Sequence, residues 1–218
     1  MSEVREYSMY RTRVKICGMT REQDIQAAVS AGADALGFVL WPGSRRALDL
    51  ERLAELTSQV PAFVTRVGLF VDQDPAWIQQ ASRYLDLLQF HGAEAPDSCE
   101  GFGRPWIKAL RMRDGIDLGA AAIRYQGASA LLLDAYRPGV PGGTGETFDW
   151  SRIPANLAKP VILAGGLTPD NVGEAIRRVR PYAVDVSGGV ESAPGIKDPL
   201  KLGGFCDQVF ISQSRQRT

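Results

Sequence analysis

The feature that most constrains this chain is a recurring pattern, a short apolar run followed by a polar turn and then by a segment with helical spacing. Such strand–helix units build parallel sheets. Eight of them favour closure into a (β/α)8 TIM barrel, and about 24 residues per unit predict a compact one. The eight runs are VKIC (14–17), ALGFVL (35–40), RVGLFV (66–71), LLQFH (87–91), WIKAL (106–110), ALLLDA (130–135), VILAG (161–165) and AVDVS (183–187).

An open doubly wound sheet shows the same alternation and is the main rival architecture. The count of eight argues for the closed barrel. The first turn also argues against a dinucleotide-binding sheet, because KICGMT (15–20) has one glycine and no room for a GxGxxG pattern. We therefore predict one α/β barrel domain over residues 13–211, between a loose arm at 1–12 and a polar tail at 212–218.

Several segments between the runs begin with a residue that can cap a helix. The expected N-caps are Thr20, Asp49, Asp74 and Thr168. Pro75 and Pro169 then suit the first helical position. The sixth unit differs, because a long Gly- and Pro-rich stretch, YRPGVPGGTGETFDW (136–150), replaces or shortens its helix. Loops of this length in a compact domain are commonly functional.

The charge balance argues against nucleic acid as a partner. The 218 residues carry 25 basic and 25 acidic side chains, so the broad positive field that attracts a phosphate backbone is missing and any anion site must be local. No apolar stretch approaches the length of a membrane span, which predicts no membrane partner. Cys17, Cys99 and Cys206 show no CxxC or metal-ligand spacing, which favours a reducing, cytoplasmic compartment and a site without metal.

The active site of a barrel lies at the carboxyl ends of its strands, so residues that end the runs are the candidates for chemistry. Cys17 ends the first run and precedes Gly18, which aims its sulfur into the barrel mouth. An isolated strand cysteine is more often a small buried hydrophobic residue. At this position, however, a nearby cation or helix N-terminus can stabilise a thiolate. Cys99 and Cys206 keep the structural interpretation.

Acidic side chains occur at the ends of two other runs. Asp134 follows three leucines, and such an apolar strand end favours the protonated carboxyl group that a general acid needs. Taken alone, the residue is equally well interpreted as a capping or salt-bridging aspartate. Asp185 raises the same question, and we assign it a substrate-binding or orienting role.

Three basic residues are candidate substrate ligands. Arg46, in the loop after the second run, offers a planar pair of donors to an anionic group, although a solvated loop residue is the alternative. Lys15 shares one strand face with Cys17, so it meets either a substrate anion or an acidic neighbour in the barrel core. His91 is the one histidine of the chain, and its strand-end position balances a functional role against a structural one.

Glycine pairs follow the seventh and eighth runs, at Gly165–Gly166 and Gly188–Gly189. Barrels usually hold a phosphate group at these two turns, between backbone amides and a helix N-terminus. Either pair alone could be an ordinary turn that needs positive φ. The two pairs together favour a phosphate site, and with the other candidates they indicate a small phosphosugar substrate.

Ordered motifs run through almost the whole chain. They are VKICGMT (14–20), GADALGFVLWPGSRR (32–46), RVGLFV (66–71), QFHG (89–92), LLLDA (131–135), GGTGETFDW (142–150), LAGGLTPDNV (163–172) and DVSGGVESAPGIKD (185–198). From Arg13 to about Phe210 this set resembles the phosphoribosylanthranilate isomerase family. Any one motif would be weak, whereas the set in this order is highly specific.

The resemblance implies an isomerase of tryptophan biosynthesis. It would convert N-(5-phosphoribosyl)anthranilate to 1-(2-carboxyphenylamino)-1-deoxyribulose 5-phosphate by an Amadori rearrangement, with no metal or organic cofactor. It implies that Cys17 is the general base, that Asp134 is the general acid and that Arg46 holds the anthranilate carboxylate. The family's phosphate-binding turns match Gly165, Gly166, Ser187 and Gly189. Where the family usually reads DVSSGVE, Gly188 replaces the second serine and keeps only a backbone amide.

Two other functions are compatible with a phosphosugar-binding barrel. The isomerase of histidine synthesis runs the same Amadori step on a larger, two-phosphate substrate with a pair of carboxylates. The cysteine at position 17 argues against that enzyme and against a dual-substrate one. A barrel that only binds phosphosugars, as a sensor or partner subunit, is the non-enzymatic alternative, and retention of both Cys17 and Asp134 argues against it.

Overall fold

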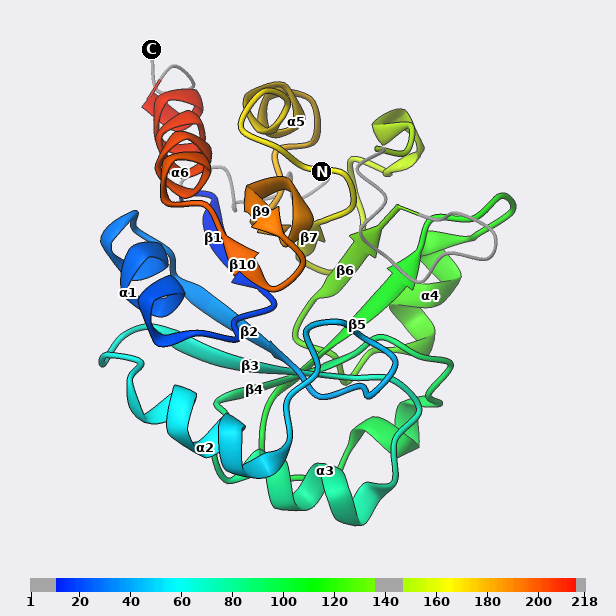
Figure 1. The fold of residues 1–218 in the computed structure, drawn as a ribbon. Helices are drawn as coiled ribbons and strands as arrows, with labels where there is room; N and C mark the ends of the chain where they lie inside the picture. The colour runs from blue at the N-terminus through cyan, green and yellow to red at the C-terminus, as the bar shows by residue number, and fades with distance from the viewer. Residues whose placement is uncertain (1–10, 136–146, 215–218) are drawn as a thin grey trace.

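Eight parallel strands close into a barrel in the order in which they occur along the chain (Figure 1). The computed structural model describes residues 11–135 and 147–214. The strands are β1 (Arg13–Cys17), β2 (Ala35–Val39), β3 (Thr65–Phe70), β4 (Leu87–Phe90), β5 (Trp106–Arg111), β6 (Leu131–Asp134), β7 (Val161–Leu163) and β8 (Ala183–Val186). No strand boundary differs from the expected run by more than two residues, so the predicted closed barrel is confirmed.

Helices surround the strands and cover the outside of the barrel (Figure 1). They are α1 (Glu22–Ser30), α2 (Leu50–Ser58), α3 (Pro75–Ser82), α4 (Leu118–Arg124), α5 (Val172–Val179) and α6 (Pro199–Ser214). Short 3-10 helices η2 (Pro96–Cys99), η3 (Trp150–Arg152) and η4 (Gly188–Val190) follow β4, β6 and β8. The described part of the β6–β7 connection holds only η3, as expected for a shortened sixth helix. Residues 136–146 of the predicted loop lie outside the described residues.

Two of the four predicted helix caps are confirmed. The carboxylate of Asp49 accepts the backbone N–H of Arg52, and that of Asp74 accepts the N–H of Ala76, both at 2.8 Å. These bonds satisfy amides that a helix leaves without a partner in its first turn.

The caps predicted at Thr20 and Thr168 are wrong. The hydroxyl of Thr20 donates to the carbonyl of Gly195, in a small hairpin formed by β9 (Glu191–Ala193) and β10 (Ile196–Lys197), so it is not available to α1. At the second site the chain makes one turn before α5, in which the Thr168 carbonyl accepts the N–H groups of Asn171 and Val172. The helix therefore begins at Val172 rather than at Pro169.

The folded domain includes residues that were expected to lie in the arm and the tail. Thr12 is buried, and its hydroxyl donates to a backbone carbonyl. Helix α6 continues past the expected end of the domain, with Ser212 buried and the amide of Gln213 donating to the Thr12 carbonyl at 2.9 Å. The first and last segments of the described domain are thus in contact at Thr12 and Gln213, whereas residues 1–10 and 215–218 lie outside the described residues.

The inside of the barrel has an apolar lower layer, and the chemistry-bearing side chains lie above it. The lower layer contains Ile107, Ala109, Ala130, Leu132, Ile162, Ala164 and Ala183. Strand side chains alternate, so the next inward position after Ala109 is Arg111, and the next after Leu132 is Asp134. The strand register therefore places polar side chains at one end of the barrel.

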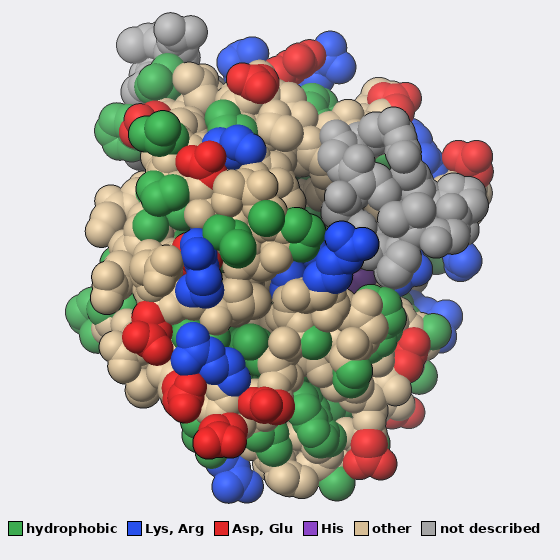
Figure 2. Space-filling view, viewed as in Figure 1, with side chains coloured by type: hydrophobic (Ala, Val, Ile, Leu, Met, Phe, Trp, Pro, Cys, Tyr) green, Lys and Arg blue, Asp and Glu red, His purple; other side chains and the backbone are tan. Residues whose placement is uncertain are grey.

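The surface of the described residues shows no dominance of one charge sign on the face drawn in Figure 2, where acidic and basic side chains are interspersed. This pattern agrees with the equal numbers of acidic and basic residues. Within the described residues, no helix combines the length and the apolar character needed to cross a membrane.

Candidate active site

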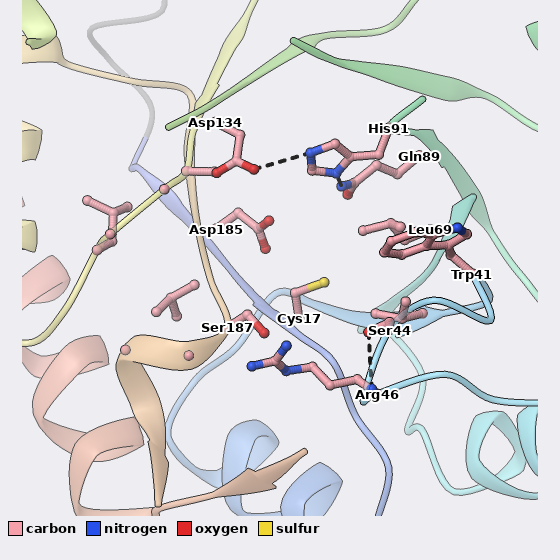
Figure 3. Close-up of a pocket in the computed structure, with 18 of the residues that line it drawn as sticks. Cys17, Trp41, Ser44, Arg46, Leu69, Gln89, His91, Asp134, Asp185 and Ser187 are labelled. Carbon is pink, nitrogen blue, oxygen red and sulfur yellow. Dashed lines mark hydrogen bonds and ion pairs between the residues drawn. The ribbon is translucent and has the colours of Figure 1, made fainter. Parts of the chain in front are cut away.

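A cavity of about 310 Å³ lies at the carboxyl ends of the strands, and residues at or just beyond the ends of all eight strands line it (Figure 3). This volume is at the lower end of the range for small-molecule sites. Ten of the residues expected at the site line it, namely Cys17, Arg46, His91, Asp134, Gly165, Gly166, Asp185, Ser187, Gly188 and Gly189. The structure therefore brings nearly the whole predicted set together.

Cys17 ends β1 and is 5% exposed, with its side chain directed toward the cavity (Figure 3). Gly37 on the neighbouring strand makes room for it, because a Cβ there would lie 2.7 Å from the sulfur. Burial raises the pKa of the Cys17 thiol, and the ammonium groups of Lys15 and Lys197 act in the opposite direction. Cations are near the sulfur as expected, but they do not outweigh burial, so the thiol dominates at neutral pH.

Lys15 and Asp185 form a buried ion pair on the same inner face. The Lys15 Nζ lies 2.7 Å from Asp185 Oδ1, and the two side chains are 5% and 10% exposed. The pairing of β1 with β8 places the two residues opposite each other. Asp185 lines the cavity, whereas Lys15 does not. The structure therefore supports the core-pair interpretation of Lys15 rather than the substrate-binding one.

Arg46 is held by a carboxylate of the protein itself. Its Nε and Nη2 donate to the two oxygens of Glu191 at 2.7 and 2.5 Å. The buried Lys197 donates to the same carboxylate at 2.8 Å and to the carbonyl oxygens of Cys17 and Ser187. Burial opposes ionisation of Glu191, but the bonds from Arg46 and Lys197 outweigh it and lower its pKa. The β9–β10 hairpin thus ties the Arg46 loop to the ends of β1 and β8.

Asp134 ends β6 and faces His91 across the cavity (Figure 3). The distance from His91 Nε2 to Asp134 Oδ2 is 3.2 Å. The other ring nitrogen, Nδ1, lies 3.1 Å from Nε2 of Gln89, which is two residues earlier on the same strand face. The proposed acid is therefore the end of a three-residue chain of side-chain contacts.

The two glycine turns lie against each other. Gly165 and Gly166 have φ values of +81° and +67°, which side-chain-bearing residues rarely adopt. A Cβ on Gly189 would lie 1.9 Å from the Leu167 carbonyl oxygen. The backbone therefore requires glycine at these places even without a ligand. The amides of Gly165 and Gly166 donate to no carbonyl of a described residue.

Several residues of the site escaped the sequence interpretation. Trp41, Ser44, Gln89 and Arg111 line the cavity as well. Gln89 could have been found from strand alternation, because it lies two residues before His91. Arg111 directly follows the fifth predicted run, and its exposed side chain makes no ion pair with any described residue. Among the described residues, no group of three or more His, Cys, Asp or Glu side chains is placed to hold a metal ion.

Comparison with known proteins finds one family over nearly the whole chain. A family model described as N-(5'phosphoribosyl)anthranilate (PRA) isomerase matches residues 14–208. A protein of Chromohalobacter salexigens named N-(5'-phosphoribosyl)anthranilate isomerase is 72% identical over 206 residues, which cover 94% of this chain and 98% of that protein.

Solved structures of proteins with this name also match the fold of the chain. The crystal structure of phosphoribosyl anthranilate isomerase from Thermotoga maritima has a TM-score of 0.84 at 38% identity and covers 91% of this chain and 98% of its own. A crystal structure of phosphoribosyl anthranilate isomerase in complex with reduced 1-(o-carboxyphenylamino)-1-deoxyribulose 5-phosphate has a TM-score of 0.81 at 37% identity, with the same coverage of 91% and 98%.

Proposed function

The chain belongs to the N-(5'-phosphoribosyl)anthranilate isomerase family, and from that premise we propose that Cys17 is the general base and Asp134 the general acid of its reaction. The enzyme converts N-(5'-phosphoribosyl)anthranilate to 1-(2-carboxyphenylamino)-1-deoxyribulose 5-phosphate by an Amadori rearrangement in tryptophan biosynthesis. The observation that carries the two roles is that Cys17 and Asp134 line one cavity at the carboxyl ends of β1 and β6.

The first step opens the ribose ring. Asp134 gives its proton to the ring oxygen, the bond from that oxygen to C1 breaks, and the nitrogen lone pair forms a protonated C1=N Schiff base. The ring oxygen becomes the C4 hydroxyl, and Asp134 is left as a carboxylate. His91, 3.2 Å from Asp134 Oδ2, is placed to stabilise that carboxylate.

The second step removes the proton from C2. Cys17 in its thiolate form takes this proton, the C2–H electron pair forms C1=C2, and the C1=N pair returns to nitrogen to give an enolamine. The imine accepts the electrons, so this step needs no metal or organic cofactor. C1 of the enolamine then gains a proton and the C2 hydroxyl loses one. The rearrangement consumes no net proton and no electron.

Substrate binding is assigned to the remaining cavity residues. We place the phosphate group at Gly165, Gly166, Ser187, Gly188 and Gly189, whose two turns are in contact. We place the anthranilate carboxylate at Arg46, because Nη1 is the guanidinium nitrogen that Glu191 does not hold. Asp185 lies between Asp134 and Cys17 in the view of Figure 3, which suits a role in orienting the sugar.

Family membership and the residue at the base position both favour the proposed isomerase over its rivals. Family membership favours an enzyme over a barrel that only binds phosphosugars. A second activity on the histidine-pathway substrate is disfavoured by a cysteine at the base position. We also propose a cytoplasmic location, which the three free, buried cysteines suit, since thiols persist in a reducing compartment.

The roles are tested by trapping the open-chain imine. In Cys17→Ser, Asp134 still opens the ring, so borohydride should reduce and trap the C1=N bond while C2 exchanges no hydrogen with D2O. In Asp134→Asn, neither trapping nor exchange should occur. Continued C2 exchange in Cys17→Ser would rule out the base role, and trapped imine in Asp134→Asn would rule out the acid role.

A further inference from the structure

Gln89 is a buried amide for which the proposed chemistry has no role. Its side chain is 0% exposed, and its register neighbours on β3 and β5 are the apolar Leu69 and Ile107. The amide nitrogen contacts His91, whereas the amide oxygen has no hydrogen-bond partner among the described residues. A buried carbonyl oxygen without a partner costs free energy, so its retention calls for a functional reason.

The amide fixes the position of the proton on the histidine ring. With the amide nitrogen facing the ring, as in this structure, Gln89 can only donate, so His91 Nδ1 accepts and the ring proton is on Nε2. Nε2 then donates to Oδ2 of Asp134 at 3.2 Å. The hydrogen bonds run in one direction, from Gln89 through His91 to Asp134.

The opposite orientation of the amide would have a different chemical result. The oxygen of Gln89 would then accept a proton held on His91 Nδ1, and the lone pair of Nε2 would face Asp134. A hydrogen bond to Nε2 would then require the proton of Asp134 to be on Oδ2. That oxygen is turned toward His91, so the acid proton would be engaged by the ring instead of being available to the sugar.

The backbone around His91 is anchored. The His91 N–H donates to the Phe70 carbonyl at 2.8 Å. The next residue, Gly92, donates its N–H to Glu94 and accepts the buried ammonium of Lys108, which is itself paired with Glu94 at 2.6 Å. With the backbone anchored, the ring is oriented by its two side-chain contacts, to Gln89 and to Asp134.

We propose that Gln89 is a positioning residue that holds His91 in the Nε2–H tautomer, so that Asp134 carries its acid proton on Oδ1 and the carboxylate left after transfer receives the His91 N–H. This inference rests on the proposed role of Asp134 as the acid. On the acid side of the cavity, Gln89 then donates a hydrogen bond to His91, and His91 donates one to Asp134.

The test uses the one histidine of the chain, because selective 15N-histidine labelling of the full-length enzyme then reports His91 alone. In the wild type, the 15N shifts should show a bare Nδ1 and a protonated Nε2. In Gln89→Glu, which accepts where glutamine donates, Nδ1 should become protonated. Gln80→Glu adds the same charge on the exposed surface of α3 and should leave the spectrum unchanged.

Protonated Nδ1 in the wild type, or an unchanged spectrum in Gln89→Glu, would overturn the inference. If Gln89→Glu does not fold, Gln89→Met removes the donor without adding charge, and the single Nε2–H state should give way to a mixture of tautomers. A pure Nε2–H state in Gln89→Met would contradict the proposal equally.

The kinetic prediction separates positioning from packing. In Gln89→Glu, kcat should fall by roughly 10- to 100-fold, the usual effect of losing a partner that orients a histidine ring, while KM changes less than threefold. A rise in KM with normal kcat would contradict positioning. The acid role and the tautomer inference can fail separately. An active Asp134→Asn enzyme would rule out the acid role, whereas the wild-type 15N spectrum of His91 would still show a protonated Nε2.

Discussion

The two sides of the cavity are built from different interactions. Around Cys17 the protein places buried ion pairs, between Lys15 and Asp185 and between Glu191 and its two cations. Around Asp134 it places a chain of hydrogen bonds through His91. Arg111 lies opposite Asp134 in the β5–β6 register, yet among the described residues Asp134 is paired with His91 and not with Arg111.

The difference follows from the two chemical tasks. A buried thiol becomes a base only if cations offset the cost of burying its charge. A carboxyl group remains an acid only if no cation pairs with its ionised form. Charges on one side and neutral donors on the other therefore suit the two sides of one cavity to different chemical tasks. Each prediction below perturbs one side and leaves the other as its control.

The largest effect is expected on the acid side, from Asp134→Asn. Asparagine keeps the shape and can still accept the His91 hydrogen bond, but it has no proton to release to the ring oxygen. Turnover should fall by about 10²- to 10⁴-fold or more, with the free energy of unfolding changed by less than about 1 kcal/mol. Steady-state kinetics and urea denaturation measure the two. If turnover stays near normal, or if the protein unfolds, Asp185 becomes the next candidate for the acid.

On the base side, Lys15→Met should break the buried ion pair and leave Asp185 without its partner. Burial opposes the charge on Lys15, but Asp185 and Cys17 raise its pKa, so Lys15 is charged in the wild type. Loss of one partner should lower the free energy of unfolding by about 3–5 kcal/mol in urea denaturation.

The double variant Lys15→Met/Asp185→Leu is the matched control for this loss. Replacing both partners with apolar residues should restore most of the stability. Activity should not return, because Cys17 has lost a cation that opposes the effect of burial and the sugar has lost Asp185. Recovery of activity together with stability would show that the thiol does not need Lys15.

A smaller and selective effect is expected from Arg46→Ala. Binding of the reduced product analogue, which contains the anthranilate carboxylate, should weaken by about 1.5–3 kcal/mol, the contribution of a charged hydrogen bond. Binding of ribose 5-phosphate should change much less, and the exposed neighbour Arg45→Ala should change neither. Calorimetry compares the ligands. Equal losses for both would mean that Arg46 serves the phosphate or the fold, since it lies beside Gly18 with Ser187.

The barrel and most of the site could be predicted from sequence because they depend on local patterns. Alternation along a strand places Asp134 above Leu132 on the inner face, and paired glycines mark the turns after β7 and β8. The ends of the strands were therefore enough to predict which residues meet at the cavity. The cap at Thr20 failed because its hydroxyl bonds to Gly195, a residue 175 positions away.

Residues that act through long-range pairs were not predictable in this way. Glu191 and Lys197 lie within a motif that the sequence singled out, yet nothing local shows that Glu191 reaches Arg46, which is 145 positions away. The protonation state of Cys17 was missed for a related reason. Burial depends on the whole fold, and it outweighs the cations that the sequence led us to expect.

The smallest expected effect is the change in kcat/KM with each pH unit, and it tests the role of Cys17 as the base. Burial raises the pKa of Cys17, so the thiolate is the minor form at neutral pH and its population grows as pH increases. Below that pKa, each pH unit multiplies the thiolate fraction by ten, so kcat/KM should rise about tenfold per unit between pH 7 and 8 as long as the acid keeps its proton. The residual activity of Cys17→Ser should lack this rise, because serine does not ionise in this range. A wild-type profile that is flat from pH 7 to 8 would mean that Cys17 is already a thiolate at neutral pH, that another group is the base, or that the acid loses its proton over the same range.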